Sequence, residues 1–580
     1  MEPTRRKRTK RKKRGIGGLL AGIAGALFAL LFVIGLVLYV KRYAPTGDRM
    51  ELSEYYHLED EDSAVVIVDG NYITDKEENA FGLISGGAAY IALPIVKDVI
   101  DNGYVFDEKE GILRYTTDAE VISARVNETG YTIGKDTETM DVPIVIKAHE
   151  KVFLAADFVQ RFSDIQYALY EDAPARIVAE NAGYTRTVAA LRSRTAIRRL
   201  GGPKSKVLKE SVRGEKVTVL DVVGKWTNIL TTDGVIGYVK SSSIKDKEEA
   251  TVPATLPERN YRLTLLDKRV ILGWHQTTSL AANATLSSVL EKAGKINVIS
   301  PTWFHMNDNA GGIENHASSD YVKEAHGRGI LVWGLISNFE DPNVDTTTVL
   351  NSTSARDNLI NNLVGAAIAV GLDGINIDIE LLPDDAADGY AEFIRELSLK
   401  CKKNDLILSV DVGVPSAWSM YYDRTNLANY CDYVIIMAYD EHYNSSDEPG
   451  STASLPWVSE GVAGTLQEVP AEQIVLGMPF YSRVWTMKDG DLSSLSIHMR
   501  EIPDYMERHD LKQQWREAEE QNYVEYTDEG AKHMLWIEDA TSMGERLVLM
   551  EENALGGCAF WKLGSEPKEI WEVINGYADE

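Results

Sequence analysis

Asp373-Gly-Ile-Asn-Ile-Asp-Ile-Glu380 is the stretch that decides the fold, because it places acidic and amide side chains within a short apolar strand. Asn376, Asp378 and Glu380 are spaced by two, so on a β-strand their side chains project from the same side. Such groups are poor core material, because burying a charge is costly unless a partner compensates. A structural ion network or a metal site could use the same residues. Acid–base catalysis is favoured, because the other strand ends offer no clear second cluster of ligands.

Seven further apolar runs lie around this strand in the sequence. Near-continuous apolar strands separated by helical stretches, such as 355–370 and 386–403, indicate a parallel sheet that is buried on both faces. Eight such strands predict an α/β fold, a (β/α)8 TIM barrel over residues 262–577, with its chemistry at the C-terminal ends of the strands. The expected strands are 269–274, 296–303, 329–335, 374–380, 406–412, 433–440, 473–480 and 557–561.

The segment between the last two strands, residues 486–550, exceeds one helix. It contains the short strand-like runs 523–526 and 534–537. We therefore expect a small α+β insertion at this point of the barrel.

The N-terminal region combines a basic tail with an apolar run. Residues 16–40 contain no charged side chain and follow a tail, residues 1–15, that is rich in lysine and arginine. As a helix, this run would be roughly 37 Å long at 1.5 Å per residue, enough to cross a hydrocarbon core of about 30 Å. A cleaved signal peptide is the competing interpretation, but its apolar region is usually only about 7–15 residues long. We expect a single-pass membrane helix, with the basic tail cytoplasmic and the remainder at the bacterial cell surface.

The net charge of −28 limits the classes of partner, because the body of the protein is acidic. Phosphate binding needs a basic surface, so nucleic acid is not an expected partner. The three cysteines, Cys401, Cys431 and Cys558, form no CxxC pair and are expected to be buried thiols. The sequence does not indicate any protein partner.

Residues 51–185 contain an internal repeat. Tyr90-Ile-Ala-Leu-Pro-Ile-Val96 matches Phe153-Leu-Ala-Ala-Asp-Phe-Val159, and each is followed eight residues later by a tyrosine. Each copy predicts a strand, a short helix and two further strands. The region resembles the α+β module named from copper amine oxidase N-terminal domains. The resemblance implies a stalk, and an anonymous spacer would have the same consequence.

Residues 186–247 predict a small β-barrel domain, because short strands alternate with glycine-containing turns. The phrases Gly-Lys-Trp-Thr-Asn-Ile and Gly-Val-Ile-Gly-Tyr-Val-Lys resemble bacterial Src-homology-3-like domains. That resemblance implies binding of cell-wall peptides, and a rigid spacer is the equal alternative. Residues 248–261 are charged and contain proline, so they are expected to be a linker.

Several motifs in the barrel resemble glycoside hydrolase family 18, in particular its spore-cortex and cell-wall peptidoglycan hydrolase branch. They are the acidic strand already quoted, Met437-Ala-Tyr439-Asp440, the run Gly477-Met-Pro-Phe-Tyr-Ser-Arg-Val-Trp485, and Trp561. The motifs occur in the family's order and cover residues 262–577. The resemblance implies a glycosidase that needs neither a metal nor a cofactor.

The resemblance also assigns roles. It implies that Glu380 protonates the glycosidic oxygen, while the substrate's own 2-acetamido group attacks the anomeric carbon. Asp378 would orient that group, Tyr439 would hydrogen-bond its carbonyl oxygen, and Asn376 completes the catalytic strand. The expected sugar-binding residues are Trp561, Asp440, Tyr481, Arg483, Trp303 and Trp274.

Asn376 is a departure from the family, because many chitinases have aspartate at this position. An aspartate can share a proton with the middle carboxylate, whereas an amide cannot titrate. We therefore expect Asp378 to be more fully ionised in this chain.

The expected function is cleavage of β-1,4 bonds after N-acetylglucosamine in peptidoglycan or a chitin-like polymer. The main alternative is a surface protein that binds such a polysaccharide on an inactive barrel. The third possible function is that of a chitinase proper.

Overall fold

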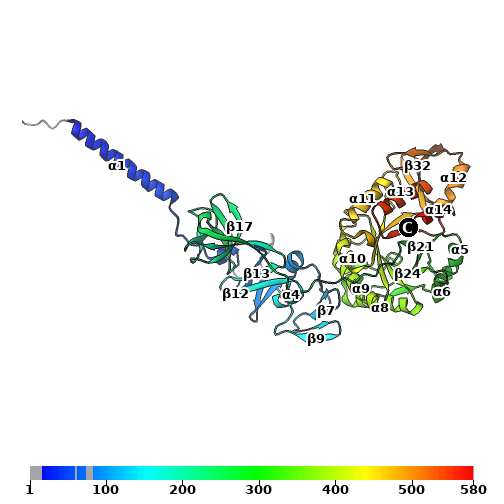
Figure 1. Ribbon diagram of the computed structural model, residues 1–580, viewed down its shortest axis with the longest axis horizontal. Helices are drawn as coiled ribbons and strands as arrows, with labels where there is room; N and C mark the ends of the chain where they lie inside the picture. The colour runs from blue at the N-terminus through cyan, green and yellow to red at the C-terminus, as the bar shows by residue number, and fades with distance from the viewer. Residues whose placement is uncertain (1–15, 59, 61, 74–81, 579–580) are drawn as a thin grey trace, which may run out of the picture. The chain divides into compact units, whose positions relative to one another are not determined.

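The computed structural model describes residues 16–58, 60, 62–73 and 82–578, and the chain divides into two compact units. One unit contains residues 1–102 and 146–257, and the other contains residues 103–145 and 258–580. The basic tail predicted at residues 1–15 lies outside the described residues. The two units are described separately below, and Figure 1 shows the elements of both.

The first helix, α1 (Ile16–Tyr43), extends three residues beyond the predicted apolar run. An 18-residue window of its segment Leu20–Tyr43 has a mean hydropathy of 2.8, and none of that window is buried. By length and composition the helix could cross a membrane, and a signal sequence near an N-terminus has the same properties.

The second unit contains the predicted barrel, which is confirmed. Eight parallel strands, coloured from green through yellow to red in Figure 1, pair in order, and the first pairs with the last. The strands are β21 (Val270–His275), β22 (Val298–Met306), β24 (Leu331–Ser337), β25 (Gly374–Asp378), β26 (Ile407–Gly413), β27 (Tyr433–Met437), β28 (Ile474–Pro479) and β34 (Gly557–Trp561).

Helices follow the strands and cover the outside of the barrel. The longest, α8 (Thr353–Val370), begins where the Ser352 side chain accepts a hydrogen bond from the backbone N–H of Ala355. It ends at Gly371, whose φ of +79° suits a residue without a Cβ. The other covering helices are α5 (Leu286–Leu290), α6 (Ser319–Gly327), α7 (Thr346–Asn351), α9 (Ala387–Lys403), α10 (Arg424–Tyr430), α11 (Leu455–Thr465), α13 (Ala540–Glu552) and α14 (Ile570–Ala578).

The core of the barrel forms two layers. Side chains that point inward, including Trp274, Trp333 and Tyr433, fill the barrel interior. Side chains that point outward, such as Ile375 and Ile377, pack against the helices. This alternation leaves the ends of the strands as the place where polar groups can reach solvent. All three cysteines are buried and free, as predicted.

The insertion before the last barrel strand is a five-stranded antiparallel sheet with one α-helix, α12 (Ile502–Arg508). Its first strand begins at Tyr481, a few residues before the predicted start. The strands are β29 (Tyr481–Lys488), β30 (Asp491–His498), β31 (Gln514–Arg516), β32 (Gln521–Asp528) and β33 (Ala531–Ile537).

A second antiparallel sheet packs on the barrel helices and comes from within the predicted stalk. Thr116 donates a 2.6 Å hydrogen bond to the buried carboxylate of Glu392 in α9. Arg114 forms a 2.8 Å ion pair with Asp357 in α8. The region predicted as one stalk, 51–185, is thus divided between the two units. The strands are β5 (Tyr104–Asp107), β6 (Ile112–Thr116), β7 (Val121–Arg125), β8 (Gly130–Ile133) and β9 (Asp136–Thr139).

In the first unit, the two copies of the predicted repeat lie side by side. Their strands β4 (Ala88–Ala92) and β11 (Lys151–Ala155) pair antiparallel, and each leads into a short helical segment. The sheet is completed by β1 (Ser63–Val68), β2 (Asn71–Tyr72), β3 (Gly82–Ser85), β10 (Val145–Ala148), β12 (Ile165–Tyr170) and β13 (Ala175–Asn181).

The first unit also contains a seven-stranded antiparallel sheet over residues 185–251. The Src-homology-3-like assignment of this region stays a prediction. The strands are β14 (Thr185–Leu191), β15 (Ala196–Arg198), β16 (Val207–Glu210), β17 (Lys216–Val223), β18 (Trp226–Thr231), β19 (Ile236–Lys240) and β20 (Ile244–Thr251).

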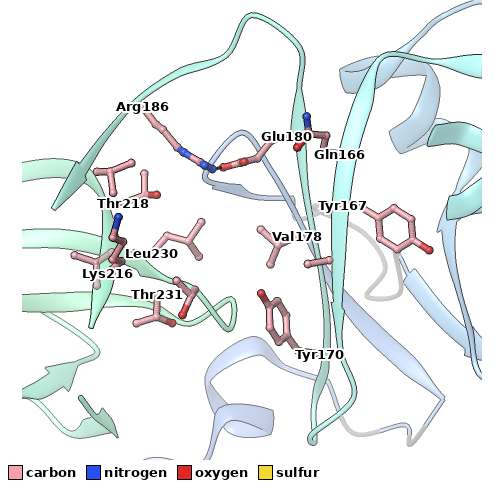
Figure 2. A pocket seen from close by; sticks show the side chains of 14 residues that line it. Gln166, Tyr167, Tyr170, Val178, Glu180, Arg186, Lys216, Thr218, Leu230 and Thr231 are labelled. Atoms are coloured by element: carbon pink, nitrogen blue, oxygen red, sulfur yellow. Dashed lines mark ion pairs between the residues drawn. The ribbon is translucent and has the colours of Figure 1, made fainter. Parts of the chain in front are cut away.

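A cavity of about 330 Å³ lies between this sheet and strands β12 and β13 of the same unit (Figure 2). Glu180 and Arg186 form an ion pair on its wall, and Lys216 and Tyr170 also line it. The charged groups of this cavity are therefore of both signs.

Candidate active site

A cleft of about 300 Å³ opens at the C-terminal ends of the barrel strands. Asp378 is the last residue of β25, Glu380 follows two residues later, and Trp561 is the last residue of β34. Strand geometry therefore delivers side chains from several strands to one place. The described residues that line the cleft are Trp274, Phe339, Asp378, Glu380, Asp411, Gly413, Met437, Tyr439, Asp440, Tyr481 and Trp561.

Four of these side chains are carboxylates, and none of the residues just named is basic. Asp378 is 7% exposed and Asp411 is 2% exposed. Burial raises the pKa of Asp378 well above its usual value, and the neighbouring Asp411, Glu380 and Glu340 raise it further. Burial likewise raises the pKa of Asp411 well above its usual value, although hydrogen bonds from Asn376 and Trp274 oppose that shift.

This result overturns the expectation that Asp378 would be more fully ionised. That expectation considered Asn376 alone and overlooked a carboxylate on the neighbouring strand. Burial, and after it the negative charge of the neighbouring Asp411, raise the pKa of Asp378 and hold it toward its protonated form.

Glu380 lies beyond the end of its strand and is held by its backbone. Its N–H donates to Asn338 Oδ1 at 3.0 Å, and its C=O accepts from Asn338 Nδ2 at 3.1 Å. The side chain is half-buried. Burial raises the pKa of Glu380, and the charges of Asp440 and Glu340 raise it further. A carboxyl group in this environment retains its proton at a higher pH than an ordinary glutamate.

Aromatic rings form the walls of the cleft. Trp274 meets Trp561 and Tyr439 edge-on, with ring centroids 6.0 and 6.5 Å apart. Burial raises the pKa of Tyr439 well above its usual value, as do Tyr481 and the nearby carboxylates. The hydroxyl of Tyr439 therefore stays protonated and is able to donate a hydrogen bond.

The cleft continues into a second cavity of about 280 Å³, because Asp440, Tyr481 and Trp561 line both. Tyr481 donates a 2.7 Å hydrogen bond to Asp440 Oδ1. The second cavity is also lined by Arg483, Ser496, His498, Lys562 and Ser565. Its lining is therefore basic, in contrast with that of the main cleft.

Three of the predicted site residues, Asn376, Trp303 and Arg483, do not line the main cleft, and of these Arg483 lines the adjoining cavity. Asn376 is fully buried and hydrogen-bonds Asp411, Trp274 and Ser300. Trp303 is also fully buried, and the prediction that it binds sugar does not fit its position, because its Nε1 donates to Asn283 Oδ1 and its ring packs against Tyr321 of α6. The strand register of β22 shifts between Thr302 and Phe304, so Trp303 lies at an irregularity of its strand.

Three residues at the site escaped the sequence analysis. Asp411 and Phe339 line the cleft, and Glu340 lies close enough to raise the pKa of Asp378 and Glu380. Burial would raise the pKa of Glu340, but hydrogen bonds with His305 and Ser337 outweigh it and lower that pKa. A lone aspartate within the apolar run 406–412 was the available signal for Asp411.

Among the described residues, no group of three or more His, Cys, Asp or Glu side chains is arranged to hold a metal ion. The cleft combines buried carboxyl groups, a tyrosine hydroxyl and aromatic faces. These groups are suited to acid–base chemistry on a ligand that has both apolar and hydrogen-bonding faces.

Residues 345–566 match the family model "Glycosyl hydrolases family 18". Among curated sequences, the chain is 27% identical over 304 residues to the "Uncharacterized glycosylase YvbX" of Bacillus subtilis, covering 50% of this chain and 87% of that protein. It is 25% identical over 236 residues to the "Cortical fragment-lytic enzyme" of the same species, covering 39% of this chain and 54% of that protein. The chain thus spans only about half of the second relative.

Among solved structures, the spore cortex-lytic enzyme SleL of Bacillus cereus aligns with a TM-score of 0.49 and 19% identity. That alignment covers 57% of this chain and 77% of SleL. The matched residues 345–566 include the acidic strand, Asp411, Tyr439 and Trp561. Residues 345–566 of the barrel thus match family 18, and the similar sequences support a glycosidase.

Proposed function

We propose that the protein hydrolyses the β-1,4 bond after N-acetylglucosamine in peptidoglycan, with retention of configuration and with the substrate's acetamido group as the nucleophile. The observation that carries this proposal is the cluster of buried carboxyl groups in an aromatic cleft whose described lining contains no basic residue. Unpaired buried charge destabilises a fold, so such a cluster is retained where it performs chemistry.

Glu380 is the proposed proton donor to the glycosidic oxygen. A general acid must be protonated at the working pH and must reach the leaving group. Burial, Asp440 and Glu340 raise the pKa of Glu380, and its position beyond the strand end directs the carboxyl group into the cleft.

The substrate's own 2-acetamido oxygen is the proposed nucleophile, as in the substrate-assisted exceptions among retaining glycosidases. Asp378 would accept a hydrogen bond from the acetamido N–H and stabilise the oxazolinium as it forms. Tyr439 would donate its hydroxyl hydrogen to the acetamido oxygen, which fixes the direction of attack. Asp378 and Tyr439 both line the cleft, as these roles require.

Trp561 forms the proposed floor for the sugar whose bond is cleaved, because its apolar ring suits the apolar face of a pyranose. Trp274 is only 1% exposed and meets the Trp561 ring edge-on, so it supports that ring from within the barrel. The polar edges of the sugar would then face the carboxyl groups.

The adjoining basic cavity favours peptidoglycan over chitin as the substrate. Arg483 and Lys562 line this cavity, and Arg483 is only 8% exposed, with its Nε atom lacking a hydrogen-bond partner in the described structure. Peptidoglycan carries stem peptides with free carboxylates on the lactyl groups of alternate sugars, whereas chitin is neutral. A carboxylate in this cavity would be attracted by Lys562 and by the guanidinium of Arg483, whose Nη2 also lies 3.7 Å from Asp440 Oδ1.

The product released from peptidoglycan tests this function. The full chain, purified in detergent, is incubated with purified peptidoglycan and with chitohexaose, and mass spectrometry identifies the saccharides. We expect peptidoglycan fragments that end in a reducing N-acetylglucosamine. Fragments that end in N-acetylmuramic acid would contradict the proposal, and binding without release would support the alternative of a carbohydrate-binding surface protein.

The effect of Lys562→Gln distinguishes peptidoglycan from chitin as the preferred substrate. The substitution removes one positive charge from the basic cavity and is expected to raise KM for peptidoglycan by roughly 10-fold, the value of one charge-assisted hydrogen bond. Hydrolysis of chitohexaose should be unchanged, because that substrate has no carboxylate. An equal effect on both polymers would remove the argument for peptidoglycan.

We further propose that α1 anchors the protein in the cell membrane, with the barrel outside the cytoplasm. The support is the length and apolar composition of Leu20–Tyr43 and the basic tail that precedes it. In a Gram-positive host, the protein should remain with the membrane fraction and be degraded by protease added to protoplasts. Release of the protein, shortened at its N-terminus, into the medium would instead indicate a signal sequence.

A further inference from the structure

Asn376 contacts the carboxylate of Asp411, which has no role in the proposed function. Asn376 Oδ1 accepts hydrogen bonds from Trp274 Nε1 at 3.0 Å and from Ser300 Oγ at 2.9 Å. An indole N–H can only donate, so this contact fixes which way the amide faces. The Nδ2 of Asn376 consequently donates to Asp411 Oδ1 at 2.8 Å. The amide therefore holds the Asp411 carboxylate in place.

Strand register places Asp411 beside Asp378. In the pairing of β25 with β26, Ile377 lies opposite Val410, so Asp378 and Asp411 are each the next residue along. Neighbouring strands are about 4.8 Å apart, and side chains at level positions project to the same face. Both side chains line the cleft. The two carboxyl groups are thus neighbours in a buried site.

Two ionised carboxylates at this separation would repel strongly. At about 5 Å and an effective dielectric constant of about 20, the repulsion is roughly 3 kcal/mol. If either Asp378 or Asp411 is protonated, this repulsion is absent. The same reasoning agrees with the raised pKa of each group, which burial dominates. The other titratable groups near the pair are Glu340, Glu380, Tyr390, Tyr422 and Tyr439, and all are acidic.

Asp378 and Asp411 have different hydrogen-bond partners, and this difference decides which of the two carries the proton. Asp411 accepts a hydrogen bond from Asn376, which favours its ionised form. Asp378 Oδ1 is buried and has no hydrogen-bond partner in the described structure, which favours its protonated form. In the resting site, the proton therefore belongs on Asp378 and the negative charge on Asp411.

We propose that Asp411 is a positioning residue that shares one proton with Asp378 and receives it when the oxazolinium forms. In this step the O–H bond on Asp378 breaks and an O–H bond on Asp411 forms, while the negative charge moves from Asp411 to Asp378. The negative charge on Asp378 thus faces the acetamido group only in the transition state. An interaction that is stronger in the transition state than in the ground state raises kcat. The role of Asp378 rests on the proposed function, whereas the shared proton does not.

Infrared difference spectra of the full chain test the shared proton without activity. All variants carry Glu380→Gln, so that Glu380 contributes no signal. At neutral pH, adding either Asp378→Asn or Asp411→Asn should remove one protonated carboxyl group and leave the number of ionised carboxylates unchanged. If Asp411→Asn removes an ionised carboxylate and leaves the protonated band, Asp378 holds its proton by burial alone and the proposal is overturned.

A swap of the two side chains is the matched control. In Asn376→Asp combined with Asp411→Asn, the new amide can donate to the new carboxylate, so the hydrogen bond is kept with its direction reversed. The carboxylate introduced at position 376 would then lie on the same face of the strand as Asp378. The swap should restore the protonated band that Asp411→Asn removes. Failure to restore it in a variant with wild-type thermal stability would overturn the proposal.

Kinetics with Glu380 intact give the second readout. With chitohexaose, Asp411→Asn should lower kcat by about 100-fold, the lower end of the contribution of a positioned proton-transfer group. KM should not rise, because Asp378 would be ionised in both the ground state and the transition state. A rise in KM at unchanged kcat would overturn the proposal. Absence of hydrolysis by the wild type would refute the proposed function and leave the infrared result standing.

Discussion

The barrel cleft and the cavity of the first unit are similar in volume, about 300 and 330 Å³, yet they differ in how charge is balanced. In the cavity of Figure 2, Glu180 is paired with Arg186, and Lys216 adds a second cation. In the cleft, Asp378 and Asp411 are buried side by side, and no described residue that lines it is basic.

The two cavities therefore differ in whether their carboxylates are paired with cations, and this difference distinguishes the proposed active site better than cavity volume does. A paired carboxylate has its free energy lowered by its partner, so the fold tolerates it at little cost. A buried carboxylate without a cation has its pKa raised and is held ready to give or take a proton. Removing a carboxylate should therefore have opposite consequences in the two places.

Glu380→Gln is the largest expected effect. The amide has nearly the same shape but cannot donate an acidic proton, so kcat should fall by about 10²–10⁴-fold on peptidoglycan and on chitohexaose. Glu180→Gln, which removes a carboxylate from the other cavity, is the matched control and should leave kcat unchanged. Equal rates for wild type and Glu380→Gln would disprove the assignment of the proton donor.

Asp378→Asn should change the dependence of stability on pH. The pKa of Asp378 is raised in the folded protein, so its contribution to the free energy of unfolding is complete below the ordinary pKa of about 3.9. That contribution is lost as the pH rises through the folded pKa. The variant does not titrate at this position. Its free energy of unfolding, measured with urea, should therefore increase relative to wild type between about pH 4 and pH 8, by about 1.4 kcal/mol for each unit of pKa shift.

A constant difference across that pH range would contradict the raised pKa. Activity should fall in the same variant, so that stability and activity change in opposite directions, as is common where a site is strained by its function.

Disruption of the Glu180–Arg186 pair is the smallest expected effect. Both side chains are partly exposed, so Arg186→Gln should change the free energy of unfolding by at most about 1 kcal/mol. Thermal unfolding with and without added salt measures this, and chitohexaose hydrolysis should be unaffected. A large loss of hydrolysis in Arg186→Gln would remove the distinction between the two regions.

The sequence predicted the barrel well because its strands are buried on both faces. Runs such as 557–561 are wholly apolar, and that pattern has few interpretations. The spacing of Asp378 and Glu380 by two was also informative, because both side chains line the cleft even though β25 ends at Asp378.

Features that depend on strand pairing were harder to predict. Asp411 is close to Asp378 only because β26 pairs with β25 in one particular register, which no local pattern encodes. Trp303 lies at a register shift of β22, which the sequence of the strand does not reveal. Likewise, the repeat in 51–185 predicts the elements of each copy, but it does not predict that residues 103–145 pack against the barrel helices through Thr116 and Arg114.

The configuration of the first product tests the central claim most directly. Hydrolysis of chitohexaose by the wild-type chain, followed by proton NMR before the anomers equilibrate, shows which anomer forms first. Attack by the substrate's acetamido group, with Glu380 as the acid and Asp378 as the partner of the N–H, predicts the β-anomer, because configuration is retained. The α-anomer as the first product would contradict this account, because it requires direct attack by water.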